Sequence, residues 1–135
     1  MDRGAYCSSL RGGASTALCL PSGPGPGWAT AGSWWSISRS ESELSVVCEE
    51  ALVPSGVLRT GPWRALVVAD SLSHDLVGVL ATISVTLAMA EIAVFAISTF
   101  DRDWLLVPPP RLDQASSALR AAWHIVEPEV AYPSS

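Results

Sequence analysis

The sequence predicts an α+β fold whose second half follows the order strand, helix, strand, strand, helix, strand between residues 63 and 126. Three observations support this prediction. The hydrophobic period changes from two to 3.6 and back to two along residues 63–99. Turn-forming residues at 100–103 then separate two short β-rich runs, as in a hairpin. A second amphipathic segment follows a run of three prolines. The order is that of a ferredoxin-like unit, an antiparallel sheet with both helices on one face.

The composition limits the classes of function. A chain of 135 residues fits one domain or two very small ones that share a core, and 49% hydrophobic residues supply that core. The net charge of −5 argues against a nucleic-acid surface, which needs clustered cations. All eight basic residues are arginines. Without lysine there is no P-loop lysine, no Schiff-base lysine and no polybasic membrane patch.

Cysteine and histidine spacing predicts no metal site. Cys7, Cys19 and Cys48 show no CxxC pattern, and the two histidines lie 50 residues apart, whereas zinc ligands usually come in pairs close in sequence. We expect reduced thiols in a cytoplasmic protein. The first 13 residues contain no apolar segment of the kind that a secretion signal needs.

The first half reads as strands joined by loops. Residues 1–13 are small, polar and rich in glycine, and we expect them to be poorly ordered. Pro and Gly exclude helix and strand from residues 21–27. The S-x-x-E pattern of Ser40 and Glu43 predicts a brief helical turn. The expected strands are residues 14–20, 33–38 and 44–48, followed by a connector at 49–62.

The second half contains the more regular elements. A strand is expected at residues 63–69, and Ser73 or Asp75 is expected to cap the helix that follows. That helix carries one apolar stripe at 3.6-residue spacing: Leu76, Leu80, Ile83, Leu87 and Ala90. The remaining expected elements are strands at residues 92–99 and 104–107, a helix at 111–123, a closing edge strand at 125–126 and a loose tail at 127–135.

The apolar run of residues 76–100 is long enough to span a bilayer. Glu91 lies near its middle, where a charge costs about 2.5–3.5 kcal/mol on insertion scales. The period also becomes strand-like at Ile92, and the flanks carry no basic bias. We therefore predict no membrane span.

Three stretches carry a family resemblance, of which the first two are LSVVCEEALVPSGV at residues 44–57 and GPWRALVVADSLSHDLVGVLATI at 61–83. The hairpin FAISTFDRDWLLV at 95–107 is the most specific element. The sequence resembles the small paired ACT-domain proteins of bacteria, and it is similar to the ACT pairs of the CASTOR arginine sensors. The resemblance implies two ACT-like units packed side by side, without enzymatic activity, and an amino-acid ligand at their interface. Together with the composition along the chain, it gives an expected division into a disordered N-terminus (1–13), a truncated ACT-like half with its connector (14–62), an ACT domain (63–126) and a loose tail (127–135).

The resemblance also implies a binding site. In the family, the ligand is held by the loop after the first strand, the strand after the first helix and the end of the hairpin. The matching residues are Ser73, His74, Asp75, Ala93, Val94, Thr99, Phe100 and Asp103. Free N–H groups at a helix start favour a carboxylate, and a nearby aspartate suits a cation. No cofactor, no metal and no catalytic residue is implied.

The sequence departs from the family at glycine positions. Glu91 stands where the family has Gly after the first helix, and Trp123 stands where it has Gly after the second. A left-handed conformation is expected at both, at about 1–2 kcal/mol for a residue other than Gly. His74 and Asp75 replace an aromatic and a small residue in the ligand loop.

Several readings remain open. His74 and Asp75 resemble a base with its orienting carboxylate, but adjacent side chains rarely face each other and no nucleophile is fixed nearby. Asp101 and Asp103 are typical of a turn as much as of a cation site. The leading hypothesis is an amino-acid-binding regulatory module. The alternative is an ACT-fold interaction protein that has lost its ligand and uses the apolar outer side of the first helix, formed by Ala81, Val85 and Met89. An enzyme is the third and weakest class. A homodimer or a regulatory protein partner is expected, without nucleic acid or membrane.

Overall fold

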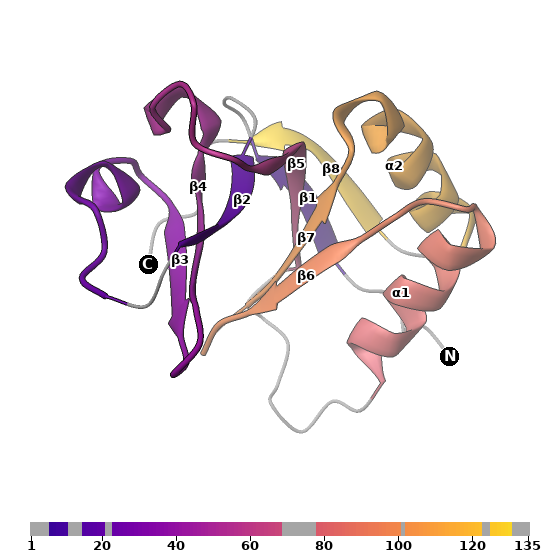
Figure 1. Cartoon of the computed structure of the whole chain (residues 1–135). Helices are drawn as coiled ribbons and strands as arrows, with labels where there is room; N and C mark the ends of the chain where they lie inside the picture. The colour runs from indigo at the N-terminus through magenta and orange to yellow at the C-terminus, as the bar shows by residue number, and fades with distance from the viewer. Residues whose placement is uncertain are drawn as a thin grey trace. The chain divides into compact units, whose positions relative to one another are not determined.

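The computed structural model describes residues 6–10, 15–20, 23–68, 78–100, 102–122 and 125–130. The chain divides into two compact units (Figure 1). The larger unit contains residues 1–11, 64–133 and 135, and the smaller unit contains residues 12–63 and 134. Strand β5 (Thr60–Val68) runs through the boundary, so its first residues belong to the smaller unit and its last to the larger.

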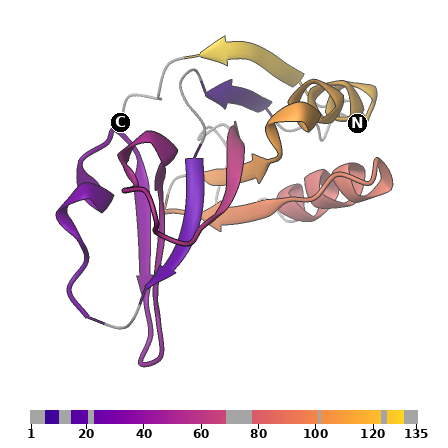
Figure 2. The same cartoon turned by 45° about the horizontal axis from the view of Figure 1, so that its top comes forward.

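The larger unit is built on a five-stranded sheet in the order β6–β7–β5–β1–β8 (Figures 1 and 2). Its other strands are β1 (Tyr6–Leu10), β6 (Phe95–Ser98), β7 (Asp103–Val107) and β8 (Ile125–Val130). All neighbours are antiparallel except β1 and β8, which are parallel. Arg64 pairs with Val107 and Val67 with Trp104, so β5 ends beside the start of β7.

Two helices complete the predicted order of elements. Helix α1 (Val79–Met89) connects β5 to β6, and helix α2 (Leu112–Ala121) follows the 3-10 turn η3 (Pro109–Arg111) and leads into β8. The sequence β5-α1-β6-β7-α2-β8 is the ferredoxin-like order of an ACT fold. The predicted fold class is therefore confirmed.

One apolar core lies between this sheet and both helices. It is formed by same-face residues of β5 and β7, by buried residues of α1 and α2, and by one residue after α1: Leu66, Val68, Leu105, Val107, Ile83, Leu87, Ala115, Leu119 and Ile92. Both helices therefore pack on one face of the sheet, as the period of 3.6 predicts for the α1 stripe. Each large aliphatic side chain buried in this way contributes roughly 1.5–3 kcal/mol.

The N-terminal segment differs from the prediction. Tyr6–Leu10 form β1, which lies between β5 and β8, whereas residues 1–13 were expected to be poorly ordered. Polar and apolar residues do not alternate along Tyr6–Leu10, so the sequence does not predict a strand there. The strand forms because β5 and β8 supply hydrogen-bond partners for its backbone groups on both sides. The same pairing extends β8 to Val130, so the expectation of a loose tail is wrong for residues 127–130. Residues 131–135 lie outside the described residues.

The smaller unit contains a sheet in the order β3–β4–β2. The first residues of β5 pair with β2 and extend this sheet. Its strands are β2 (Ser15–Leu20), β3 (Trp35–Arg39) and β4 (Leu44–Glu49), as predicted within one or two residues. The 3-10 turns η1 (Gly27–Thr30) and η2 (Glu50–Leu52) stand outside the strands. Its core consists of Ala29, Leu44, Val46, Cys48 and Val53.

The helical turn expected at Ser40–Glu43 is wrong. These residues form the turn between β3 and β4, where Arg39 pairs with Leu44. The hydrogen bond that the capping pattern predicts still forms, because the backbone N–H of Glu43 donates to Oγ of Ser40 at 3.2 Å. A serine side chain satisfies the same local N–H in a turn as at a helix start. The pattern therefore identified the local bond but not the element.

Helix α1 is shorter than the apolar run that contains it. It ends at Met89, and β6 begins at Phe95, so the run of residues 76–100 is not one helix. Within the described part of the chain, every helix is too short to cross a bilayer.

Candidate functional site

The eight predicted site residues fall into three groups along the larger unit. Ser73, His74 and Asp75 lie outside the described residues. Helix α1 begins at Val79, and its N-cap is Gly78, with φ of +85° and no side-chain capping bond. The prediction that Ser73 or Asp75 caps this helix is therefore wrong, and the N–H groups of the helix start belong to residues after Gly78.

The second group lies at the turn of the β6–β7 hairpin. Oγ of Ser98 donates a hydrogen bond of 2.6 Å to Oδ1 of Asp103, its direct partner across the two strands. The turn itself is closed by Thr99, whose N–H donates to the carbonyl of Arg102 at 2.8 Å. Oγ1 of Thr99 lies 3.1 Å from the same carbonyl and accepts from the N–H of Arg102 at 3.2 Å. The hydroxyl of Ser98 thus orients the carboxylate of Asp103. Backbone and side-chain hydrogen bonds between Thr99 and Arg102 close the turn beside it.

The sequence carries only an indirect signal for this role of Ser98. Once the turn is placed at residues 100–101, the antiparallel register pairs Ser98 with Asp103, and directly opposed side chains on one face are within bonding reach. Phe100 extends from the same turn with 84% of its surface exposed. The last residues of β5 are at this end of the sheet, because Val67 pairs with Trp104.

Ala93 and Val94 form the third group, at the opposite end of β6. Ala93 is exposed, and Val94 is half-buried against the helical core. Thr99 comes six positions after Ala93, and an extended chain rises about 3.3 Å per residue, so roughly 20 Å lies between the second and third groups. The structure therefore brings Thr99, Phe100 and Asp103 together but leaves Ala93 and Val94 apart from them.

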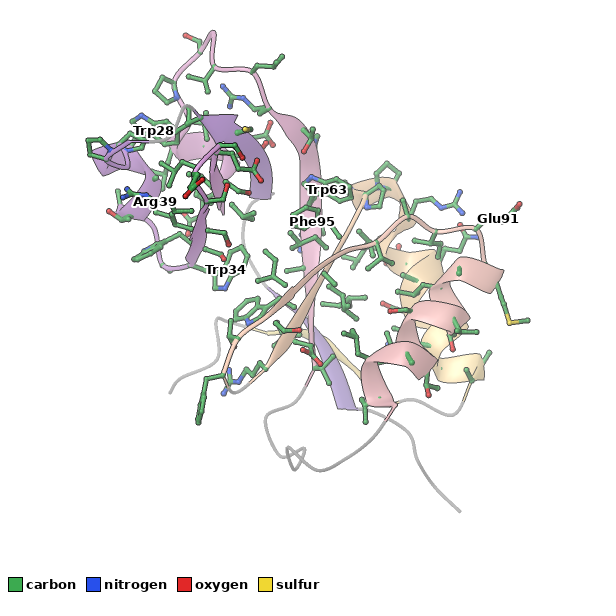
Figure 3. The ribbon with its side chains drawn as sticks, turned by 60° about the horizontal axis from the view of Figure 1, so that its bottom comes forward. Trp28, Trp34, Arg39, Trp63, Glu91 and Phe95 are labelled. Carbon is green, nitrogen blue, oxygen red and sulfur yellow. The ribbon has the colours of Figure 1, made fainter. Side chains whose placement is uncertain are left out.

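A left-handed residue shapes the backbone beside Ala93. Glu91 has a φ of +58°, as expected for the position where the family has Gly. Its N–H donates to the carbonyl of Ala88 at 2.9 Å, and the N–H of Ile92 donates to that of Leu87 at 3.0 Å. This pair of bonds is a Schellman motif, and Leu87 and Ile92 make its apolar contact in the core. Figure 3 shows the Glu91 side chain pointing away from the helices.

Arg111 supports the same turn from the start of α2. One of its guanidinium nitrogens, Nη2, lies 3.3 Å from the carbonyl oxygens of both Ala90 and Glu91. These carbonyls would otherwise lack partners at the helix end. Nε of Arg111 is buried and has no hydrogen-bond partner among the described residues. No signal in the sequence singles out this arginine.

Two described cysteines, Cys19 and Cys48, lie in the smaller unit. Burial raises the pKa of the Cys48 thiol, and the charge of Glu49 adds to that effect. The pKa of Cys19 is raised because its thiol donates to Oε2 of Glu43, 3.4 Å away. A raised pKa lowers the fraction of nucleophilic thiolate. Among the residues that the structure describes, no three His, Cys, Asp or Glu side chains are grouped to hold a metal ion.

Two family models match the chain. Residues 59–121 match the model of the ACT domain, which covers β5 through α2. Residues 20–56 match a second model, described as the N-terminal domain of another family. No curated protein matches the chain.

Solved structures share the fold. A protein from Agobacterium tumefaciens is 28% identical, with a TM-score of 0.87 over 98% of each chain. Aspartate kinase from Clostridium acetobutylicum, described as an allosteric enzyme, is 9% identical with a TM-score of 0.64, over 92% of this chain but 35% of its own. The regulatory subunit of aspartate kinase from Thermus flavus is 14% identical with a TM-score of 0.52, over 90% of this chain and 97% of its own.

Proposed function

We propose that this chain is a non-enzymatic regulatory module of ACT type that binds an amino acid in the cytoplasm. The observation that carries the proposal is the oriented carboxylate of Asp103 on the hairpin of a domain that matches the ACT model. We also propose the division into a truncated ACT-like half (14–62) and an ACT domain (63–126). The similarity to a regulatory subunit of aspartate kinase supports the regulatory role.

The chemistry of the hairpin favours a ligand with a cationic group. Asp103 is half-buried, and Ser98 orients its carboxylate from the neighbouring strand. Hydrogen bonds between ionised partners are roughly twice as strong as neutral ones, so an ammonium or a guanidinium would gain most from this group. We place the ligand carboxylate at residues 73–75 and the following helix start, where backbone N–H groups favour an anion.

A screen of thermal unfolding against the twenty amino acids tests this function. A ligand present at 100 times its dissociation constant stabilises the folded chain by about 2.7 kcal/mol. We expect a rise in the melting temperature with one basic amino acid or a small set of them. A chain whose melting temperature responds to none of the twenty at millimolar concentration would lack the proposed activity.

The second candidate function is an interaction protein of the same fold without a ligand. Its support is the outer side of α1, where Val85 is 57% and Met89 is 82% exposed. Ala81 and Ala88 are exposed on the same helix, and no charged residue occurs from Val79 to Met89. An uncharged helix with an exposed apolar side is typical of a buried interface. Capture of a partner by the chain without any amino-acid effect would favour this function.

A further inference from the structure

We infer that Arg111 is a positioning residue for the ligand, because it fixes the end of helix α1 whose start would hold the ligand carboxylate. This inference rests on the proposed function, which places that carboxylate at the N–H groups of the helix start. Helix α1 is one unbroken element of 11 residues. It is about 16 Å long at about 1.5 Å per residue. A displacement of its last turn along the axis therefore displaces its first turn as well.

The start of α1 is open to an anion. Its N-cap, Gly78, makes no side-chain capping bond, and the first turn contains no acidic residue. The N–H of Thr82 donates to the carbonyl of Gly78 at 2.9 Å, which begins the helical bonds. The N–H groups of residues 79–81 have no hydrogen-bond partner among the described residues. These donors lie at the positive end of the helix dipole, so their position decides where a carboxylate binds.

Apolar packing alone does not fix α1 along its axis. Ile83 and Leu87 are its two fully buried residues, and their contacts with the sheet are non-directional. Residues 79–89 carry no charge that could form an ion pair. Hydrogen bonds are directional. Within the described parts of the chain, the hydrogen bonds that join α1 and its C-terminal turn to another element are those of Arg111.

Arg111 fixes the backbone at this turn. Its Nη2 lies 3.3 Å from the carbonyl oxygens of Ala90 and Glu91. These carbonyls belong to the two peptide planes on either side of the Glu91 Cα atom, so a donor that holds both also holds the φ and ψ angles of Glu91. Its φ of +58° is unfavourable for a residue with a side chain, so it needs such a hold. Arg111 also supplies the cation that a helix C-terminus favours, because the last turn of α1 has no basic residue.

The segment that carries Arg111 is itself well fixed. Residues 108–110 are three prolines, whose rings restrict φ. The N–H of Arg111 donates to the carbonyl of Pro108 at 2.9 Å within the turn η3. Val107, immediately before the prolines, is fully buried at the end of β7. The guanidinium therefore reaches the end of α1 from a support that is anchored in the sheet.

Calorimetry on the full-length chain tests this role, with L-arginine and L-lysine as probes. Arg111→Met removes both hydrogen bonds and should lower the affinity by about tenfold or more, because binding groups must keep their geometry within about 0.5 Å. Adding Glu91→Gly should restore the affinity to within about threefold of Glu91→Gly alone, since Gly keeps the left-handed turn without help. Adding Glu91→Ala instead removes the same carboxylate but keeps the strain, so it should restore nothing.

The stability control is Ala118→Gly, about two turns further along α2 than Arg111. Gly lowers the stability of a helix interior, so this variant should melt at a lower temperature. It leaves the hydrogen bonds to the end of α1 in place, and its affinity should equal that of the wild type. Circular dichroism would verify that each variant is folded at the temperature of the titration. An equal loss of affinity in Ala118→Gly and Arg111→Met would attribute the loss to stability and refute the positioning role.

Hydrogen exchange without ligand measures the turn itself. The amides of Glu91 and Ile92 donate the two bonds that close the turn to α1. Both should exchange about tenfold faster in Arg111→Met, relative to the amides of β7, because local opening no longer requires the loss of the Arg111 bonds. Adding Glu91→Gly should return both amides to slow exchange.

Unchanged affinity in Arg111→Met, or unchanged exchange at Glu91 and Ile92, would overturn the positioning role. A loss of affinity that Glu91→Gly does not restore would also overturn it, because the guanidinium would then act on the ligand directly. A wild type that binds neither L-arginine nor L-lysine would instead overturn the proposed function. Faster exchange in Arg111→Met of such a chain would still support the hold of Arg111 on the end of α1.

Discussion

The guanidinium of Arg111 donates a hydrogen bond to the carbonyl oxygen of Glu91, 3.3 Å away, and so connects the start of α2 to the left-handed residue just after α1. Glu91 is the only residue other than Gly with a positive φ among those described. A left-handed glutamate is unfavourable by itself, so its neighbours must hold it. The Schellman bonds of residues 87–92 and the two bonds from Arg111 do this.

Replacing Glu91 with Gly should stabilise the chain. Gly adopts a φ near +58° without strain, which recovers about 1–2 kcal/mol, while its greater freedom in the unfolded chain removes part of that gain. We expect a net gain of about 1 kcal/mol in the free energy of unfolding, measured with urea. Glu91→Ala is the control, because it removes the carboxylate but keeps the strain. Equal stability of the Gly and Ala variants would contradict a role for the backbone conformation.

Replacing Arg111 with Met should destabilise the larger unit. The substitution keeps an apolar stem of similar length but removes both bonds to the end of α1, and hydrogen bonds to charged groups contribute about 1.5–3 kcal/mol. The control is Gln114→Met, at an exposed position in the first turn of α2. It should change the free energy of unfolding by less than about 0.5 kcal/mol. Equal effects of the two substitutions would show that the bonds of Arg111 add no stability.

Replacing Asp103 with Ala should lower the affinity for a basic amino acid by about 1.5–3 kcal/mol, the scale of a hydrogen bond to a charged group. The melting temperature without ligand should change little, because the bond from Ser98 is exposed to solvent. Ser98→Ala breaks the same bond and keeps the carboxylate, so it should lower affinity much less. Calorimetry on the three proteins separates these effects. Unchanged affinity in Asp103→Ala would place the ligand elsewhere.

Replacing Glu43 with Ala should make Cys19 more reactive. Glu43 raises the pKa of Cys19, first by accepting its hydrogen bond and also by its charge. Without Glu43 the pKa falls toward its ordinary value, so more thiolate is present at about pH 8, and alkylation by iodoacetamide should be faster. The rate is measured in a Cys7→Ser background, with Glu41→Ala as the control at an exposed neighbouring position. A slower rate in Glu43→Ala would contradict this cause of the raised pKa.

Some of the candidate site follows from the sequence and some does not. The hairpin was predictable from the strand periods on both sides of the turn, but its register was not. A turn at residues 100–103 would pair Thr99 with Trp104, whereas the structure pairs Ser98 with Asp103. The left-handed turn at Glu91 was also predictable, from the position of a family glycine. The start of α1 was not, because several polar residues before the apolar stripe are equally suited to cap a helix, and the helix begins after Gly78.

The sequence by itself determined the elements whose signals are local. Periods of 3.6 and two placed α1, α2 and the strands β5 to β7, since a helix or strand must bury the face that its own residues make apolar. Only the tertiary structure decided which distant segments pair. It inserted β1 between β5 and β8 and joined Arg111 to the end of α1, through backbone groups that every residue carries alike. Such pairing depends on which strand lies nearby in space. The residue types of Tyr6–Leu10 therefore do not predict it.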